Sequence, residues 1–305
     1  MNSPHIPVLK NEVLELFSPC EEGVLIDCTL GFGGHSQALL QAHPKLQIIG
    51  IDQDREAREF CQNFLPQERV KILAGNFTEK IEEALHCPNI IGILADIGVS
   101  SLQLDDPKRG FGFHSLELDM RMNRDQSLKA SMLINSYPKM ELERIFRDYG
   151  EIKEYKKMAQ LITQEREKKP FESAIELSEF LQKHFKKYKI HPATLAFQAL
   201  RIEVNDELNA LQSLLTQIIK HKNKLSNVIF AVISFHSLED RIIKNAFRTW
   251  EKSCICPPEA LRCECGNSHS LGKILTKKPL SASEEELKLN PRSRSAKLRA
   301  FQFRN

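Results

Sequence analysis

Short apolar runs alternate with helix-like periodicity through the first hundred residues of the chain. The apolar runs are of strand length and cover Val24–Cys28, Leu46–Ile51, Val70–Leu73 and Ile90–Ala95. Apolar residues recur at helical spacing at positions 9–17 and 55–64, and a further helix is expected to open at 37–41. Strands that alternate with helices in this way predict a parallel, doubly wound α/β sheet.

A different pattern occupies the middle of the chain. From Ser127 to about Leu215 the sequence is rich in Glu, Lys and Leu at helical spacing, and no convincing strand interrupts it. A β-branched strand follows at 228–233, and the segments 273–280 and 297–303 are expected to form an antiparallel pair at one sheet edge. The expected organisation is a first sheet part at 1–105, a helical insertion at 106–212 and a second sheet part at 213–305.

Composition narrows the class of protein. The 305 residues are 41% hydrophobic and 27% charged, which is ordinary for a globular protein. There is no run of about eighteen apolar residues, and the N-terminus lacks the regions of a signal peptide, so a cytoplasmic location without membrane attachment is expected. The net charge is only +3, so nucleic-acid binding has to rest on local patches, of which the basic stretch from Pro291 is the clearest.

The turn after the first strand predicts a nucleotide-type cofactor. Gly31, Gly33 and Gly34 bring bare backbone and a helix start close to a ligand. The third glycine of the dinucleotide fingerprint is replaced by Ser36, which weakens a pyrophosphate interpretation. Asp52 ends the second strand, nineteen positions after Gly33, where a carboxylate can accept hydrogen bonds from ribose hydroxyls. Ribose without pyrophosphate indicates S-adenosyl-L-methionine; the alternative is a glycine turn in another kind of α/β protein.

Four further side chains are candidates for the same site, each with a simpler alternative. His35 either donates to the methionine carboxylate of the cofactor or holds the glycine turn, and Phe77 either lies on a purine or belongs to the core. Asp96, at the end of the fourth strand, either accepts the hydrogens of an attacking amine or binds the cofactor. His236 either donates to a substrate base or holds the turn at 234–237.

The cysteines fall into two groups. Four are arranged as two C-x-C pairs, at Cys254, Cys256, Cys263 and Cys265. Paired thiolates on tight turns suit a structural zinc ion, and reduced thiols in a loop are the alternative. The other four, Cys20, Cys28, Cys61 and Cys87, are scattered and are expected to be small buried residues.

A series of motifs runs nearly the full length of the chain in a fixed order. They are HIPVL (5–9), DCTLGFGGHS (27–36), GIDQD (50–54), DIGVSSLQLD (96–105), RGF (109–111), LDMRM (118–122), HPAT (191–194), FQALRIEVNDEL (197–208), SFHSLEDR (234–241) and NPRSRSAKLR (290–299). Together they resemble the bacterial small-subunit rRNA cytosine-N4 methyltransferase family, the RsmH or MraW family.

The resemblance implies a class I S-adenosyl-L-methionine-dependent methyltransferase (Rossmann-like) fold with an inserted helical domain. It also implies methylation of a decoding-site cytidine of 16S rRNA in the assembled small ribosomal subunit. The cofactor contacts that it implies are Gly33, Gly34, His35, Asp52, Phe77, Asp96 and Gln103. Leu195, in place of a basic residue, and the 114–117 loop depart from the family pattern, as does the cysteine cluster.

Several questions stay open at this stage. A methyltransferase for DNA or a small molecule and an assembly factor without turnover are the competing functions, and the chain is either a monomer or a homodimer. The aromatic loop Phe111–Phe113 is expected to form the wall opposite the sheet. Arg109, Arg121 and Arg201 are expected to be available for RNA phosphates.

Overall fold

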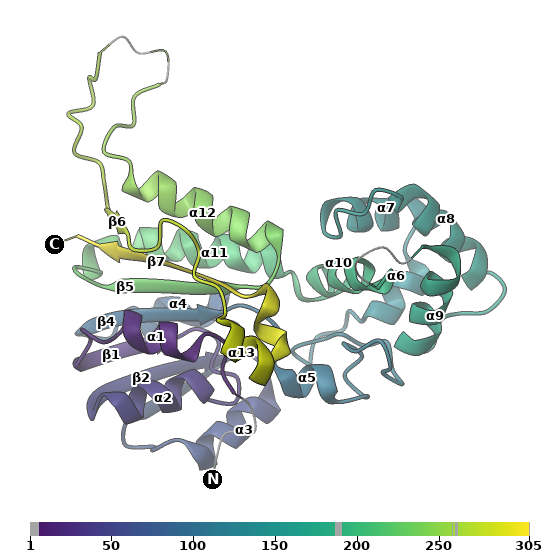
Figure 1. Ribbon diagram of the computed structural model, residues 1–305, viewed down its shortest axis with the longest axis horizontal. Helices are drawn as coiled ribbons and strands as arrows, with labels where there is room; N and C mark the ends of the chain where they lie inside the picture. The colour runs from purple at the N-terminus through teal and green to yellow at the C-terminus, as the bar shows by residue number, and fades with distance from the viewer. Residues whose placement is uncertain (1–5, 187–190, 258, 260–261, 305) are drawn as a thin grey trace. The chain divides into compact units, whose positions relative to one another are not determined.

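Two compact units make up the chain. The computed structural model describes residues 6–304 except 187–190, 258 and 260–261, so His5 of the first motif lies outside the described residues. The first unit combines Met1–Gly98 with Ala210–Asn305, and the second is Val99–Asn209 (Figure 1). The helical insertion was expected at 106–212, whereas the second unit begins seven residues earlier and ends three residues earlier.

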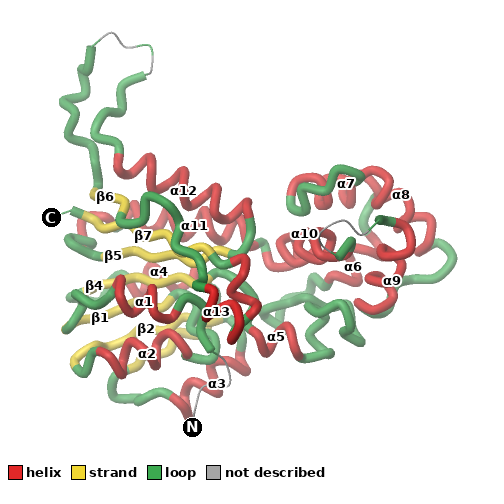
Figure 2. Tube along the Cα trace, viewed as in Figure 1, coloured by secondary structure: helices red, strands yellow, loops and turns green. Residues whose placement is uncertain are grey.

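A seven-stranded sheet forms the centre of the first unit, in the order β3-β2-β1-β4-β5-β7-β6 (Figure 2). Its strands are β1 (Glu22–Asp27), β2 (Lys45–Asp52), β3 (Val70–Ala74), β4 (Ile90–Asp96), β5 (Ile229–Ser234), β6 (Gly272–Ile274) and β7 (Lys297–Phe303). The five strands from β3 to β5 are parallel, and β7 runs antiparallel to both of its neighbours. The chain order reverses between β1 and β4, the position where parallel α/β sheets bind ligands.

Both faces of the sheet are buried at its central strands β1, β4 and β5, which explains why these strands consist of nearly continuous apolar residues. Alternate residues of β5 separate between two clusters. Phe230 and Val232 pack in one cluster with helices α11 (Glu207–Lys220) and α12 (Ser237–Glu251). Ile229, Ala231 and Ile233 pack in the other with helices α1 (Lys10–Leu16) and α2 (Gly34–Ala42). Apolar packing on both faces therefore fixes the position of the central strands and of their carboxyl ends.

The helices of the first unit mostly begin at a capping residue. Asp54 accepts from the Glu56 N–H at 3.0 Å and begins α3, and Asn76 accepts from the Thr78 N–H at 2.9 Å and begins α4. These caps satisfy backbone donors that have no partner within the helix. The helical elements are α1 (Lys10–Leu16), α2 (Gly34–Ala42), α3 (Arg55–Phe64), α4 (Phe77–Ala84), α11 (Glu207–Lys220, which starts in the second unit), η1 (Lys222–Lys224), α12 (Ser237–Glu251), α13 (Glu284–Leu289) and η2 (Pro291–Ser295).

The second unit is helical and has an apolar core of its own. Its helices are α5 (Ser101–Asp105), α6 (Ala130–Ser136), α7 (Lys139–Asp148), α8 (Tyr155–Arg166), α9 (Ala174–His184) and α10 (Ala193–Asn205). Asn205 fixes an irregular segment to this core, since its side chain accepts from the Met122 N–H at 2.7 Å and donates to the Met120 carbonyl at 2.8 Å. In the described part of the chain, no helix is long and apolar enough to cross a membrane.

The fold class predicted from the sequence is confirmed, and so is the antiparallel pair at the sheet edge. Two local expectations were wrong. The expected strand at 273–280 ends at Ile274, and only a single bridge joins Leu280 to Leu298. The second helix begins at Gly34 instead of 37, because Gly33 adopts a left-handed conformation and serves as its N-cap.

Candidate cofactor and active site

The glycine turn is tied to the end of β1 by a buried carboxylate. Asp27 accepts from the Ser36 hydroxyl at 2.7 Å and from the Thr29 N–H at 3.2 Å. Burial raises the pKa of Asp27, and the hydrogen bond from Ser36 acts in the opposite direction. The serine that interrupts the dinucleotide fingerprint therefore closes the turn internally.

Glycine is required in this turn for two separate reasons. Gly31 and Gly33 have φ values of 51° and 72°, in the left-handed region that side chains disfavour. A Cβ on Gly33 would also lie 3.1 Å from Cys61 Sγ, and one on Gly34 would lie 3.3 Å from the Pro7 ring. The turn therefore needs glycine for its own conformation and packing, and the approach of a ligand to the backbone at the N-terminus of α2 stays a prediction.

Asp52 is coupled directly to the glycine turn. Its Oδ2 accepts from the Gly31 N–H and its Oδ1 from the Asp54 N–H, each at 2.7 Å. Burial raises the pKa of Asp52 to about 6, and the two N–H groups limit that rise because they stabilise the carboxylate. Each oxygen keeps a second lone pair, which is the arrangement needed to accept from two ribose hydroxyls.

His35 and Asp96 meet across the switch point of the sheet. His35 Nε2 lies 3.5 Å from Asp96 Oδ2, and the Asp96 N–H donates to the Thr29 hydroxyl at 2.6 Å. Both ring nitrogens of His35 and Oδ1 of Asp96 are buried without a hydrogen bond. A buried polar atom without a partner costs about 1–3 kcal/mol, so these three atoms are suited to a polar ligand.

Phe77 and Gln103 are the remaining predicted cofactor contacts. Phe77 is the first residue of α4, directly after the Asn76 cap, and its ring packs in part against the core. Gln103 belongs to the second unit, where it forms a capping box with Ser100 at the start of α5. Both remain predictions as cofactor contacts.

His236 lies at the carboxyl end of β5 and caps α12. Its Nδ1 accepts from the Glu239 N–H at 3.4 Å, while Glu239 Oε2 accepts from the N–H groups of Phe235 and His236. The His236 Nε2 atom is 3.1 Å from Glu239 Oε1. This geometry is what the turn-holding alternative requires, and the catalytic role of His236 stays a prediction.

Gly98, just beyond Asp96, accommodates the neighbouring ring of Phe235. A Cβ on this glycine would lie 2.8 Å from two atoms of that ring. The Ile97 N–H donates to the Ile233 carbonyl at 3.0 Å, which extends the pairing of β4 and β5 past the strand ends. The backbone at Asp96 and Ile97 is thus hydrogen-bonded to Thr29 on one side and to β5 on the other.

The expectation that three arginines are available to phosphates is contradicted by their contacts. Arg201 forms a bidentate pair with Glu207, with both N···O distances at 2.9 Å. Arg121 pairs with Asp119 and donates to two carbonyls, and Arg109 donates to the carbonyls of 121 and 122. Arg109 and Arg121 thus tie loop carbonyls and Asp119 together within the second unit, while Arg201 is held by the Glu207 carboxylate.

The aromatic loop also packs within the second unit. Phe111 is buried, and Phe113 stacks on His191 with ring centroids 4.8 Å apart and meets Phe197 edge-on at 5.0 Å. The loop is therefore anchored to the core of its own unit.

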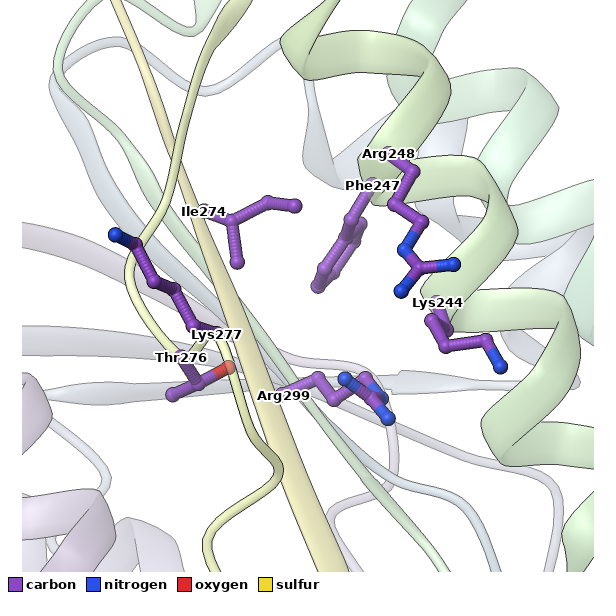
Figure 3. Close-up of a pocket in the computed structure, with 7 residues that line it drawn as sticks. All are labelled: Lys244, Phe247, Arg248, Ile274, Thr276, Lys277 and Arg299. Atoms are coloured by element: carbon purple, nitrogen blue, oxygen red, sulfur yellow. The ribbon is translucent and has the colours of Figure 1, made fainter.

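A basic recess lies on the first unit between α12 and the edge of the sheet (Figure 3). Its lining includes Lys244 and Arg248 from α12, Lys277, and Arg299 from β7, together with the apolar Phe247 and Ile274. Asp240 partly neutralises it, since its carboxylate accepts from Arg299 Nε at 2.7 Å. The remaining positive charge suits phosphate groups of a nucleic acid.

The site and the sheet together define a class of protein. The sheet is parallel except for the antiparallel β7 and its partner β6. At its carboxyl edge lie a glycine turn after β1, the Asp52 carboxylate at the end of β2, and polar atoms of His35 and Asp96 that have no hydrogen bond. This combination of groups suits S-adenosyl-L-methionine. These are the features of class I S-adenosyl-L-methionine-dependent methyltransferases.

Comparison with known proteins gives the family. The sequence matches the MraW methylase family over residues 2–304, and the chain therefore belongs to that family.

Three relatives are similar over almost their whole length, and each is named ribosomal RNA small subunit methyltransferase H. The protein of Wolinella succinogenes is 58% identical, with 100% of each chain covered. That of Helicobacter pylori strain 26695 is 56% identical, covering 100% of this chain and 99% of the relative. That of Aliarcobacter butzleri is 56% identical, covering 99% and 100%.

Sequence reasoning missed several members of the site. Asp27 and Thr29 position the turn and Asp96, but they were not among the candidates. Asp27 had a detectable signal, because it is a carboxylate that follows the apolar residues Val24–Ile26 directly. The contact of His35 with Asp96 had no signal in the sequence, since it depends on the pairing of β1 with β4.

Proposed function

We propose that this chain transfers the methyl group of S-adenosyl-L-methionine to the N4 amino group of a decoding-site cytidine in 16S rRNA. The proposal includes the assembled small ribosomal subunit as the form in which the RNA is recognised. Full-length likeness to relatives named as small-subunit rRNA methyltransferases is the observation that carries it.

The residues after β1 and β2 are proposed to hold the cofactor. Asp52 accepts from the two ribose hydroxyls through its remaining lone pairs, because Gly31 and Asp54 already fix the carboxylate. Gly33 and Gly34 allow the backbone to approach the nucleoside. A ring nitrogen of His35, which has no hydrogen bond in the protein, donates to the methionine carboxylate.

When bound, the cofactor supplies an electrophilic methyl group on a sulfonium sulfur. The N4 lone pair of cytosine is delocalised into the ring, so the amine becomes reactive only when its hydrogens are held by an acceptor. Asp96 Oδ1 is buried and has no partner, which suits it to accept from that amine. Transfer forms the N4–C bond, breaks the S–C bond and releases one N4 proton toward Asp96.

We propose that the first unit binds the RNA backbone in addition to the target cytosine. A cytidine must leave its stack to bring the amine to Asp96, and this costs a few kcal/mol that backbone contacts have to offset. Lys244 and Arg248 in the basic recess are candidates for these contacts. They lie eight and twelve residues after His236 on α12, which corresponds to about 12 and 18 Å along the helix axis.

The test is transfer of labelled methyl groups to small subunits that lack the modification, followed by mapping at base resolution. Label is expected on a single cytosine amino group, with free 16S rRNA and free cytidine as comparison substrates. Labelling of any other nucleotide, or efficient labelling of duplex DNA or free nucleoside, would refute the proposed substrate.

Two substitutions of Asp96 separate its roles. Asp96→Ala is expected to abolish turnover, since nothing then accepts from the amine. Asp96→Asn keeps the size of the side chain and an acceptor oxygen but cannot take up the proton, so we expect slow turnover with cofactor affinity largely retained. Asp148→Ala, which removes an exposed carboxylate of the second unit, is the control. A normal rate for Asp96→Ala would remove this residue from the mechanism.

A further inference from the structure

The four C-x-C cysteines lie in a long loop that projects from the first unit between α12 and β6 (Figure 1). Its described residues contain no helix or strand. Two backbone hydrogen bonds close the base of the loop, from the His269 N–H to the Ser253 carbonyl at 3.0 Å and from the Leu271 N–H to the Trp250 carbonyl at 2.8 Å. Loops longer than about 12–15 residues without secondary structure of their own are uncommon in compact proteins and are usually functional or disordered.

The four sulfur atoms converge in this loop. Cys254 Sγ lies 3.6 Å from Cys263 Sγ and 3.8 Å from Cys265 Sγ, and Cys263 Sγ lies 3.6 Å from Cys265 Sγ. The Sγ atom of Cys256 completes the group, in which all four atoms lie within 4.8 Å of one another. The distances are far longer than a disulfide bond, which is about 2.05 Å.

We propose that these four thiolates bind a structural zinc ion. In a tetrahedral site with Zn–S bonds of about 2.3 Å, neighbouring sulfur atoms are about 3.8 Å apart. The three distances above match that edge length. The two C-x-C pairs therefore provide a complete set of four ligands in close to their bound arrangement.

Backbone hydrogen bonds to sulfur support the same arrangement. The Ile255 N–H, inside the first pair, donates to Cys265 Sγ at 3.4 Å. The Glu264 N–H, inside the second pair, donates to Cys256 Sγ at 3.3 Å. Each C-x-C turn thus donates to a sulfur of the other, and such bonds orient metal-bound thiolates and balance their negative charge.

Apolar packing does not explain why these cysteines come together. Cys254 and Cys263 are exposed, and the intervening Ile255 is 62% exposed. The described residues of 253–270 contribute nothing to the three apolar clusters of the protein. Cys20, Cys28 and Cys61 differ in this respect, because they are buried and the clusters of the first unit contain them.

The ligand set also indicates the kind of metal and its role. Four soft thiolates in tetrahedral geometry favour zinc or a single iron, and zinc has no redox chemistry that would endanger an exposed site. Four protein ligands leave no position open for water or substrate, so the site is structural. The methyl transfer proposed above needs no metal, and the two proposals are independent.

The full-length protein, purified without a histidine tag under reducing conditions, provides the test. Elemental analysis is expected to give about one zinc per chain, as for other Cys₄ sites. The double variant Cys263→Ser/Cys265→Ser is expected to lose the metal, whereas Cys87→Ser, outside the loop, keeps it. Replacement by Co²⁺ is expected to give the thiolate charge-transfer and d–d absorption bands of a tetrahedral sulfur site.

A second readout concerns the loop itself. Removal of the metal by a chelator is expected to make four more thiols reactive toward a thiol reagent and to speed proteolytic cleavage between residues 252 and 271. Cofactor affinity is expected to be unchanged in the double variant. The proposal is overturned if the wild-type protein holds no zinc and its four thiols react freely, if iron replaces zinc, or if the double variant keeps the metal.

Discussion

The ionisation of Asp52 should make ribose binding depend on pH near neutrality. Burial raises the pKa of this carboxyl to about 6 in the free protein. Ribose hydroxyls are donors to it, so they favour the ionised form. Because the pKa is raised to about 6, the binding-competent carboxylate is almost fully present at pH 8, is half present near pH 6 and is lost as the pH falls further.

The size of the effect follows from the ionised fraction. With a pKa of about 6, roughly 99% of Asp52 is ionised at pH 8 and about 9% at pH 5. If only the ionised form binds, affinity falls about elevenfold between these two values, or about 1.4 kcal/mol. Below pH 5 each further unit costs another factor of about ten.

Adenosine is the appropriate ligand for the measurement. It carries the two ribose hydroxyls, but it lacks the carboxylate and amine of methionine and has no group that titrates between pH 5 and 8. Titration calorimetry over that range gives the affinity, and circular dichroism at each pH confirms that the protein is folded.

The variant Asp52→Asn distinguishes this carboxyl from Asp27, whose pKa burial also raises. The amide nitrogen would face the N–H of either Gly31 or Asp54, so weaker binding at pH 8 is expected together with a flat profile. A wild-type affinity for adenosine that does not change with pH would refute the reasoning. A pH dependence that persists in Asp52→Asn would show that another group titrates.

Two further predictions concern α12. His236→Ser keeps a side-chain acceptor at the N-cap of α12, so the stability of the protein is expected to change little. If the His236 ring also donates to the substrate base, kcat is expected to fall about 100-fold. An unchanged kcat would leave His236 only its capping role. Lys244→Ala and Arg248→Ala are expected to weaken binding to small-subunit RNA and to reduce the slope of log K against log salt by about 1 each. Lys45→Ala, which removes one charge at the amino end of β2, is the control, and an equal loss in that variant would argue against the recess.

The centre of the sheet was predictable because its strands are buried on both faces. Segments such as 46–51 and 90–95 consist almost wholly of apolar residues, so their limits agree with β2 and β4 to within one residue. The edge of the sheet was harder to predict, since β6 pairs with β7 on one side only and ends at Ile274. The start of α2 depends on the φ of Gly33, which sequence periodicity does not report.

The candidate site was predictable where a residue follows a strand directly. Asp52 and Asp96 end β2 and β4, and parallel strands bring their carboxyl ends to one edge. Arginines were poorly predicted, because a guanidinium bonds to whichever carbonyls and carboxylates the fold brings near. The Arg201–Glu207 pair, only six positions apart, could have been anticipated from the sequence.

The division of the sheet unit around residues 99–209 has a consequence for synthesis on the ribosome. Strand β4 lies between β1 and β5, yet residues 97–228 must be translated before β5 begins. At ordinary elongation rates this interval is on the order of ten seconds. During it the apolar β4 presents an unpaired edge to other nascent chains, and the core of the helical unit is complete only once residues up to Val204 have been made. Fragments that stop before β5 should therefore aggregate through that edge.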